Sequence, residues 1–86
     1  MRASILRSAS LKSLRSRTHR NLCAVLVEAR KGAELSQEEL ARRLRRSQSF
    51  IAKIEVGERR LDVLEFIEIA RALNRDPAEL LSRILG

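Results

Sequence analysis

Three polar side chains between residues 48 and 53 carry the chemistry that this sequence offers most clearly. Gln48, Ser49 and Lys53 are spaced so that a helix beginning near residue 48 would present all three on one side. A glutamine amide can pair with the N6/N7 edge of adenine, a lysine ammonium can pair with O6/N7 of guanine, and a serine hydroxyl is permissive. We therefore predict that these side chains read base edges in the major groove of DNA.

Two short helices joined by a tight turn must position these side chains. Ser36 and Glu39 have the spacing of a capping box, which predicts that the first of the two helices begins after Ser36. Ser47 is the predicted cap of the second helix. The apolar positions of the pair are Leu40, Leu44, Ile51 and Ile54. Too few residues separate the helices for antiparallel packing, so burying all four positions requires a large crossing angle, which is helix-turn-helix geometry.

Three further helices are predicted around this pair. The first should begin near Thr18, a possible N-cap, and end between residues 31 and 33. Asp62 and Glu65 form a second capping-box pattern, and Asp76 precedes a proline at the start of the last helix. The sequence predicts an all-α fold, a compact five-helix domain over residues 18–86. The helix after Asp62 is apolar over more than one stripe, which places it centrally in the fold or at a subunit contact.

The charge of the chain is concentrated at its N-terminus. The formal net charge is +7, and residues 1–20 hold six basic side chains and no acidic one. Residues 1–17 are interpreted as a basic, Ser- and Arg-rich tail that is disordered or weakly helical. An extension without a role, a basic arm that contacts DNA phosphates and an organelle transit peptide are the three interpretations of this tail.

Several function classes are disfavoured by composition. One histidine (His19) and one cysteine (Cys23) are too few for most acid–base or metal chemistry, and no glycine-rich phosphate loop or nucleophile elbow is present, so we expect no catalysis, no cofactor and no metal. The longest apolar run, residues 22–27, is far shorter than the roughly 20 residues that span a bilayer. We expect a cytoplasmic protein without a membrane partner.

Five motifs in order resemble one known family. They are LSQEELARRL (35–44), SQSFIAKIE (47–55), GERRLDVLEF (57–66), IARAL (69–73) and DPAELL (76–81). Together they look like the lambda-repressor-like, Cro/CI- or Xre-type helix-turn-helix regulators, over roughly residues 14–85. The resemblance implies a five-helix DNA-binding domain that binds double-stranded DNA, commonly as a homodimer.

The resemblance also implies residue roles. Gln37 would bind a phosphate and brace Gln48, and Ser47 would cap its helix and touch the DNA backbone. Arg30 and Glu55 match positions that form a partly buried ion pair in some relatives. The base readers would be Gln48, Ser49 and Lys53, and the further phosphate contacts would be Arg43, Arg45, Arg46, Arg59 and Arg60.

Four positions leave alternatives open. Arg45 stands where the family usually has glycine, so either the turn differs or Arg45 is held in a strained conformation by a phosphate contact. Glu34 also replaces a frequent glycine. Phe50 either packs on the preceding helix or reaches a thymine methyl or a sugar. Arg43 either contacts phosphate or is solvated.

Two functions are consistent with these patterns. The first is a sequence-specific DNA-binding transcriptional regulator, acting as a repressor. The alternative is an antitoxin-like adaptor that binds a toxin-like protein partner, with DNA binding secondary, through apolar residues of the last helix such as Ile84 and Leu85. The same two residues would also suit a homodimer contact.

Overall fold

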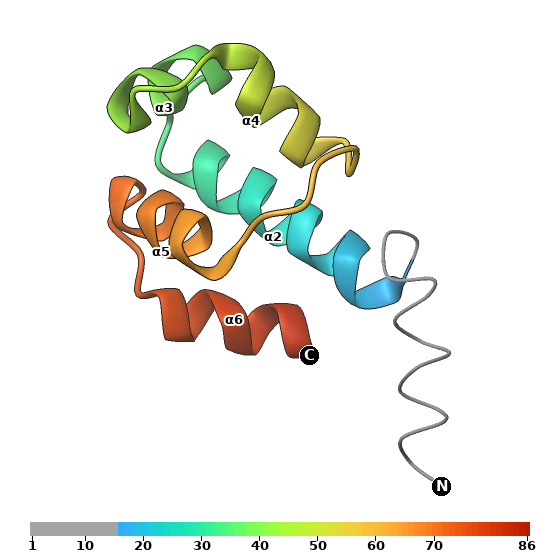
Figure 1. The fold of residues 1–86 in the computed structure, drawn as a ribbon. Helices are drawn as coiled ribbons and strands as arrows, with labels where there is room; N and C mark the ends of the chain where they lie inside the picture. The colour runs from blue at the N-terminus through green and yellow to red at the C-terminus, as the bar shows by residue number, and fades with distance from the viewer. Residues whose placement is uncertain (1–15) are drawn as a thin grey trace, which may run out of the picture.

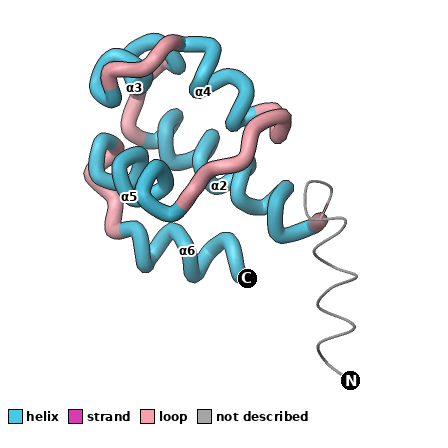
Figure 2. The backbone as a smooth tube through the Cα atoms, in the orientation of Figure 1, coloured by secondary structure: helices cyan, strands magenta, loops and turns pink. Residues whose placement is uncertain are grey.

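Five helices and their connecting turns make up residues 16–86, the part of the chain that the computed structural model describes (Figures 1 and 2). They are α2 (Arg17–Gly32), α3 (Gln37–Leu44), α4 (Gln48–Glu55), α5 (Val63–Ala72) and α6 (Pro77–Leu85). No strand occurs within residues 16–86, so the predicted all-α, five-helix fold is confirmed. The interpretation of the N-terminal tail falls mainly on residues 1–15, outside the described residues. None of the described helices is both long and apolar enough to cross a bilayer.

Local capping signals determine where most of these helices begin. The hydroxyl of Ser36 accepts the Glu39 N–H at 3.0 Å, and Glu39 Oε1 accepts the Ser36 N–H at 2.8 Å, which completes the predicted capping box. Asp62 and Glu65 form the same reciprocal pair at 2.7 and 3.1 Å. Both predicted capping boxes are confirmed.

The predicted start of α2 was wrong by two residues. Ser16, not Thr18, is the N-cap: it has an extended backbone, and its hydroxyl accepts the His19 N–H at 3.0 Å. Thr18 lies inside the first helical turn. Both residues carry a hydroxyl that could cap a helix, and the apolar stripe that begins at Leu22 does not distinguish between them.

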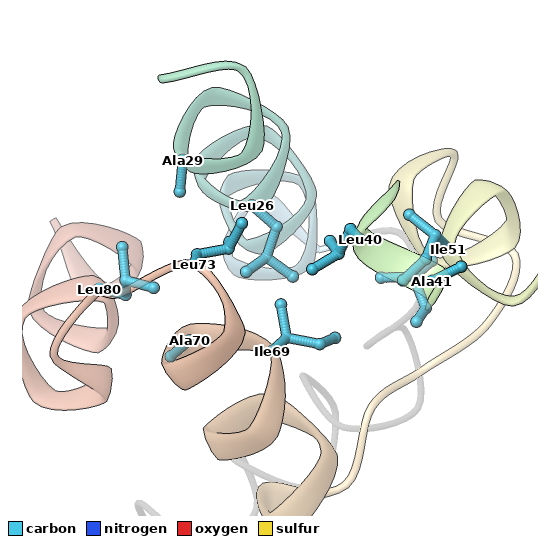
Figure 3. Packing of buried hydrophobic residues seen from close by; sticks show 10 residues of the cluster. Leu26, Ala29, Leu40, Ala41, Ile51, Ile69, Ala70, Leu73 and Leu80 are labelled. Carbon is cyan, nitrogen blue, oxygen red and sulfur yellow. The ribbon is translucent and has the colours of Figure 1, made fainter. Parts of the chain in front are cut away.

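The hydrophobic core lies where α2 faces the other four helices. α2 packs on α4 and α6, and α5 joins α3 to α6. Leu26 of α2, Leu40 of α3 and Ile69 of α5 are each at most 3 % exposed, and Figure 3 shows them converging between the three helices. The fully buried residues of this core are all aliphatic, and the two aromatic residues of the chain, Phe50 and Phe66, are partly buried and pack against it.

Three turns contain non-glycine residues with positive φ. Glu34, Arg45 and Asn74 have φ of 60°, 57° and 59°. Arg45 ends α3 in the left-handed conformation, and the Arg46 N–H reaches back to the Ala41 carbonyl at 2.9 Å. The turn therefore keeps the geometry that glycine would favour, although arginine pays a conformational penalty there.

Apolar side chains remain exposed on α5 and α6. Val63 and Leu64 are each 72 % exposed, so the broad apolar arc of α5 is not buried over its first turn within one chain. The fully buried residues of α5 are Ile69 and Ala70, in the second half of the helix. On α6, Ile84 is buried at 4 % exposure while Leu85 is 69 % exposed, so the predicted exposure of Ile84 was wrong.

Candidate nucleic-acid interface

The exposed side of α4 presents the three predicted base readers together. Gln48, Ser49 and Lys53 are all exposed, whereas Ile51 and Ile54 of the same helix are buried against α3 and α2. Within residues 16–86, no hydrogen bond or ion pair engages the side chains of Ser49 and Lys53. α3 and α4 lie together at one end of the molecule, away from the C-terminus (Figure 1). The helix is thus anchored on one face and open on the other.

A nearly buried ion pair ties α2 to the end of α4. Arg30 Nε and Nη2 donate to the two carboxylate oxygens of Glu55 at 2.7 and 3.0 Å, and Arg30 Nη1 donates to the Leu35 carbonyl at 2.8 Å. The side chains of Arg30 and Glu55 are only 11 % and 8 % exposed. The hydrogen bonds to Glu55 raise the pKa of Arg30, so the guanidinium stays charged. The pair expected from the family resemblance is present in this chain.

The same carboxylate is also linked to the exposed side of α4 through Gln37. Gln37 Nε2 donates to Glu55 Oε1 at 2.8 Å, and Gln48 Nε2 donates to Gln37 Oε1 at 2.7 Å. An unbroken chain of hydrogen bonds therefore runs from Arg30 in α2 to Gln48 on the exposed side of α4. The ion pair and the Gln37–Gln48 contact, which the family resemblance implied as separate features, are joined in the structure through Glu55.

Two arginine side chains, Arg46 and Arg59, lie over the ring of Phe50. The guanidinium carbons of Arg46 and Arg59 lie 4.4 and 4.7 Å from the centre of its ring. Phe50 is partly buried and packs against the core. Cation–π contact of this kind stabilises both partners. Phe50 is therefore packed in the structure, and its contact with a thymine methyl or a sugar stays a prediction.

Glu65 holds the two arginines that lie over Phe50. It forms a bidentate pair with Arg59 at 3.0 Å for both contacts, and Arg46 lies 3.5 Å from its carboxylate. Hydrogen bonding from Arg59, then from the Asp62 N–H, and the positive charges of Arg59 and Arg46 lower the pKa of Glu65 to about 2. Glu65 is therefore ionised at every physiological pH. Sequence analysis recognised only its capping role, because nothing in the spacing pointed to Arg46 or Arg59.

The remaining predicted phosphate contacts occupy different places. Ser47 caps α4 by accepting the Phe50 N–H at 3.2 Å, and Arg45 and Arg60 are exposed in the turns that precede α4 and α5. Arg43 instead points to α5, where its Nη1 donates to the Ala72 carbonyl at 3.0 Å. Arg43 thus joins α3 to the end of α5, an outcome that neither of its two interpretations described.

Comparison with known proteins places this arrangement in a family. The family model described as "Helix-turn-helix" matches residues 26–80. An "XRE-family like protein" from Pseudomonas syringae pv. tomato is 43 % identical, with a TM-score of 0.79; the match covers 90 % of this chain and 94 % of that one. The chain belongs to the Xre-type helix-turn-helix family. Membership supports a DNA-binding transcription regulator.

A second solved structure shares the fold of this Xre-type domain. The clp gene regulator ClgR from C. glutamicum superposes with a TM-score of 0.74 at 23 % identity, covering 80 % of this chain and 88 % of that one. No protein with a curated description matches the chain. The range matched by the family model contains Arg30, Gln37, Gln48 and Glu55, so the whole hydrogen-bonded chain lies within the matched residues.

Proposed function

We propose that this protein is a sequence-specific transcriptional regulator, acting as a repressor, that inserts α4 into the major groove of double-stranded DNA. The observation that supports this most directly is the exposed set Gln48, Ser49 and Lys53 on a helix whose opposite face is buried. Gln48 is oriented before DNA arrives, because Gln37 already accepts a hydrogen bond from its amide. Preorganisation of this kind lowers the entropic cost of binding.

Phosphate contacts would supply most of the affinity. The proposed contacts are Gln37, Arg45, Arg46, Ser47, Arg59 and Arg60, and Arg43 would join them through guanidinium N–H groups other than the one that the Ala72 carbonyl accepts. Arg46 and Arg59 share Glu65, so they would meet phosphates while remaining paired to a carboxylate. Each neutralised phosphate releases counterions, which makes binding weaken steeply with salt. Binding as a homodimer would place two half-sites about 10 base pairs apart.

Loss of a base reader should reduce specificity selectively. We expect Gln48→Ala and Lys53→Ala each to weaken binding to a selected operator by about 1–3 kcal/mol, because each removes one base pairing. Binding to random DNA should change little, since neither change removes a phosphate contact. Selection from random DNA followed by titration of both DNA types measures this. Equal loss on operator and random DNA would contradict the assignment of these residues as base readers.

The strained turn allows stability and binding to be separated. Arg45→Gly is expected to raise the free energy of unfolding by up to about 1 kcal/mol, because relief of a left-handed penalty of about 1–2 kcal/mol exceeds the roughly 0.5–1 kcal/mol of conformational entropy that glycine loses on folding. The same change should weaken binding to all DNA sequences and reduce the salt slope by about one unit, because one phosphate contact is lost. Thermal melts and salt titrations measure the two effects.

The matched control for this prediction is Arg45→Ala. It removes the same charge but keeps a side chain at φ 57°, so DNA binding should fall equally without the gain in stability. If Arg45→Gly leaves the salt slope unchanged, Arg45 makes no phosphate contact. A stability gain shared by both variants would mean that the strain is not relieved by glycine.

Exposed apolar side chains favour one second candidate, the antitoxin-like adaptor. Leu81 and Leu85 of α6 are 47 % and 69 % exposed, and they replace the pair Ile84 and Leu85 expected from the sequence, because Ile84 is buried. A toxin-like partner or a second copy of the chain would cover such a surface. A pull-down that recovers a stoichiometric unrelated protein favours the adaptor, whereas self-association alone favours the dimeric regulator.

A further inference from the structure

The chain of hydrogen bonds from Arg30 to Gln48 passes through the Glu55 carboxylate, a group that can only accept. An ionised carboxylate carries no hydrogen, so Glu55 accepts from each of its partners. Arg30 donates to both of its oxygens, and the guanidinium in turn carries no acceptor. Arg30 holds this carboxylate in a bidentate contact, and the Glu55 side chain is only 8 % exposed.

This acceptor fixes the orientation of the next amide. Gln37 must turn its Nε2 toward Glu55, because its carbonyl oxygen would meet a carboxylate oxygen there. The Oε1 of Gln37 is then the atom that faces Gln48. Gln48 must in turn offer its own Nε2 to that oxygen, at 2.7 Å. Each amide is oriented by the one before it.

We propose that Glu55 is a positioning residue for base specificity: through Gln37, its carboxylate fixes the order in which Gln48 presents its donor and acceptor to DNA. This inference rests on the proposed function, because it assigns Gln48 to a base. With one amide hydrogen held by Gln37, Gln48 keeps its second amide hydrogen and its Oε1 for the base pair. If the amide turned over, the donor and acceptor would exchange places, and a different base edge would match.

The proposal differs from a purely structural role for the ion pair. A structural role concerns only how firmly α4 is held, so any change that weakens the pair would reduce discrimination at all base positions together. The orientation role concerns one base position. It depends on an acceptor at residue 55, and it predicts that the position read by Lys53 is unaffected.

The test replaces the ion pair without leaving a lone buried charge. Arg30→Met combined with Glu55→Leu exchanges the pair for apolar side chains of similar volume, a change that such sites often tolerate. In the full chain, binding is titrated against operator variants carrying each of the four base pairs at the position read by Gln48. We expect discrimination at that position to fall at least about fivefold, while discrimination at the Lys53 position is retained.

Arg30→Lys is the matched control. It weakens the pair by removing the bidentate geometry but leaves the Glu55 carboxylate in place. We expect lower stability with the base preference retained at the Gln48 position. Retention of full discrimination by the double variant overturns the proposal, and so does an equal loss in Arg30→Lys, because the preference would then follow the strength of the pair.

Gln37→Lys provides an independent test that leaves the ion pair intact. Lysine donates to Glu55 but has no acceptor for Gln48, so Gln48 would have to present its Oε1 to residue 37. The preferred base pair at the Gln48 position should change, and an unchanged preference overturns the proposal. If the wild-type protein selects no sequence from random DNA, the proposed function itself fails. A specific wild type with unaltered variants refutes only the role of Glu55.

Discussion

Arg30→Met is expected to lower the free energy of unfolding by about 3–5 kcal/mol. The substitution leaves the Glu55 carboxylate uncompensated at 8 % exposure, and it removes the donor that satisfies the Leu35 carbonyl. An isolated charge in such a place is far more costly than the pair is stabilising, because desolvation is no longer offset by attraction. Urea unfolding followed by circular dichroism at neutral pH measures the loss.

An exposed pair of the same chemistry supplies the control. Arg83 donates to Glu28 at 3.1 Å, but the two side chains are 46 % and 71 % exposed. Arg83→Met should therefore cost at most about 1 kcal/mol, the usual upper range for a surface ion pair. A second comparison adds Glu55→Leu to Arg30→Met, which should recover most of the lost stability. Equal costs for Arg30→Met and Arg83→Met would show that burial of the inner pair contributes nothing.

The magnitude matters because small domains have little stability to lose. Proteins unfold with free energies of about 5–15 kcal/mol, and a chain of this length buries a smaller share of its surface than larger domains do. Loss of the Arg30 side chain would thus remove a large part of the total free energy of unfolding. The ion pair also links α2 to α4, so local opening there would free the helix proposed to read DNA.

Features specified by neighbouring residues were predictable from the sequence. The capping boxes at Ser36 and Asp62 need only a hydroxyl or carboxylate and a glutamate three residues later, and both form as predicted. The apolar spacing likewise identified Leu40, Ile51 and Ile54 as core residues. In each case the signal and the structure that it specifies lie within one or two helical turns.

Contacts between side chains of different segments could not be predicted from residue spacing. Glu55 meets Gln37 across 18 residues, and no local pattern indicates that its carboxylate serves both Gln37 and the arginine of α2. Glu65 shows the same limitation: its spacing from Asp62 revealed the cap, whereas its bidentate contact with Arg59 depends on how the loop between α4 and α5 folds back. Such partners are decided by tertiary packing, which spacing alone does not encode.

At the Arg45 turn, the sequence indicated an unusual position but did not decide its conformation. Sequence reasoning identified the position as unusual and left two explanations, an altered turn or a strained arginine. The structure retains the left-handed conformation, with φ 57°. The packing of α3 against α4 requires this turn conformation. Burial of Leu40 and Ile51 outweighs the cost of about 1–2 kcal/mol for placing a non-glycine residue in the left-handed region.

Leu80→Ala is expected to destabilise the protein by about 2–5 kcal/mol. Leu80 is 0 % exposed and lies in the core beside Ala70 and Leu73 (Figure 3). Truncation removes buried apolar surface and leaves a cavity that the surrounding helices can fill only in part. The spread in the expected value reflects how far α6 can move toward α2 and α5. Thermal and urea unfolding measure the effect.

Leu85→Ala tests the same chemical change on the opposite side of α6. Leu85 is 69 % exposed, so its truncation creates no cavity and should alter the free energy of unfolding by less than about 0.5 kcal/mol. A comparable loss in the two variants would mean that α6 is held by its outer face, for example by a second chain. At temperatures where Leu80→Ala remains folded, its base preference should equal that of the wild type, because α6 packs on α2 and α5 while α4 alone presents the proposed base readers. A shift in base preference would instead show that α6 positions α4 through the core.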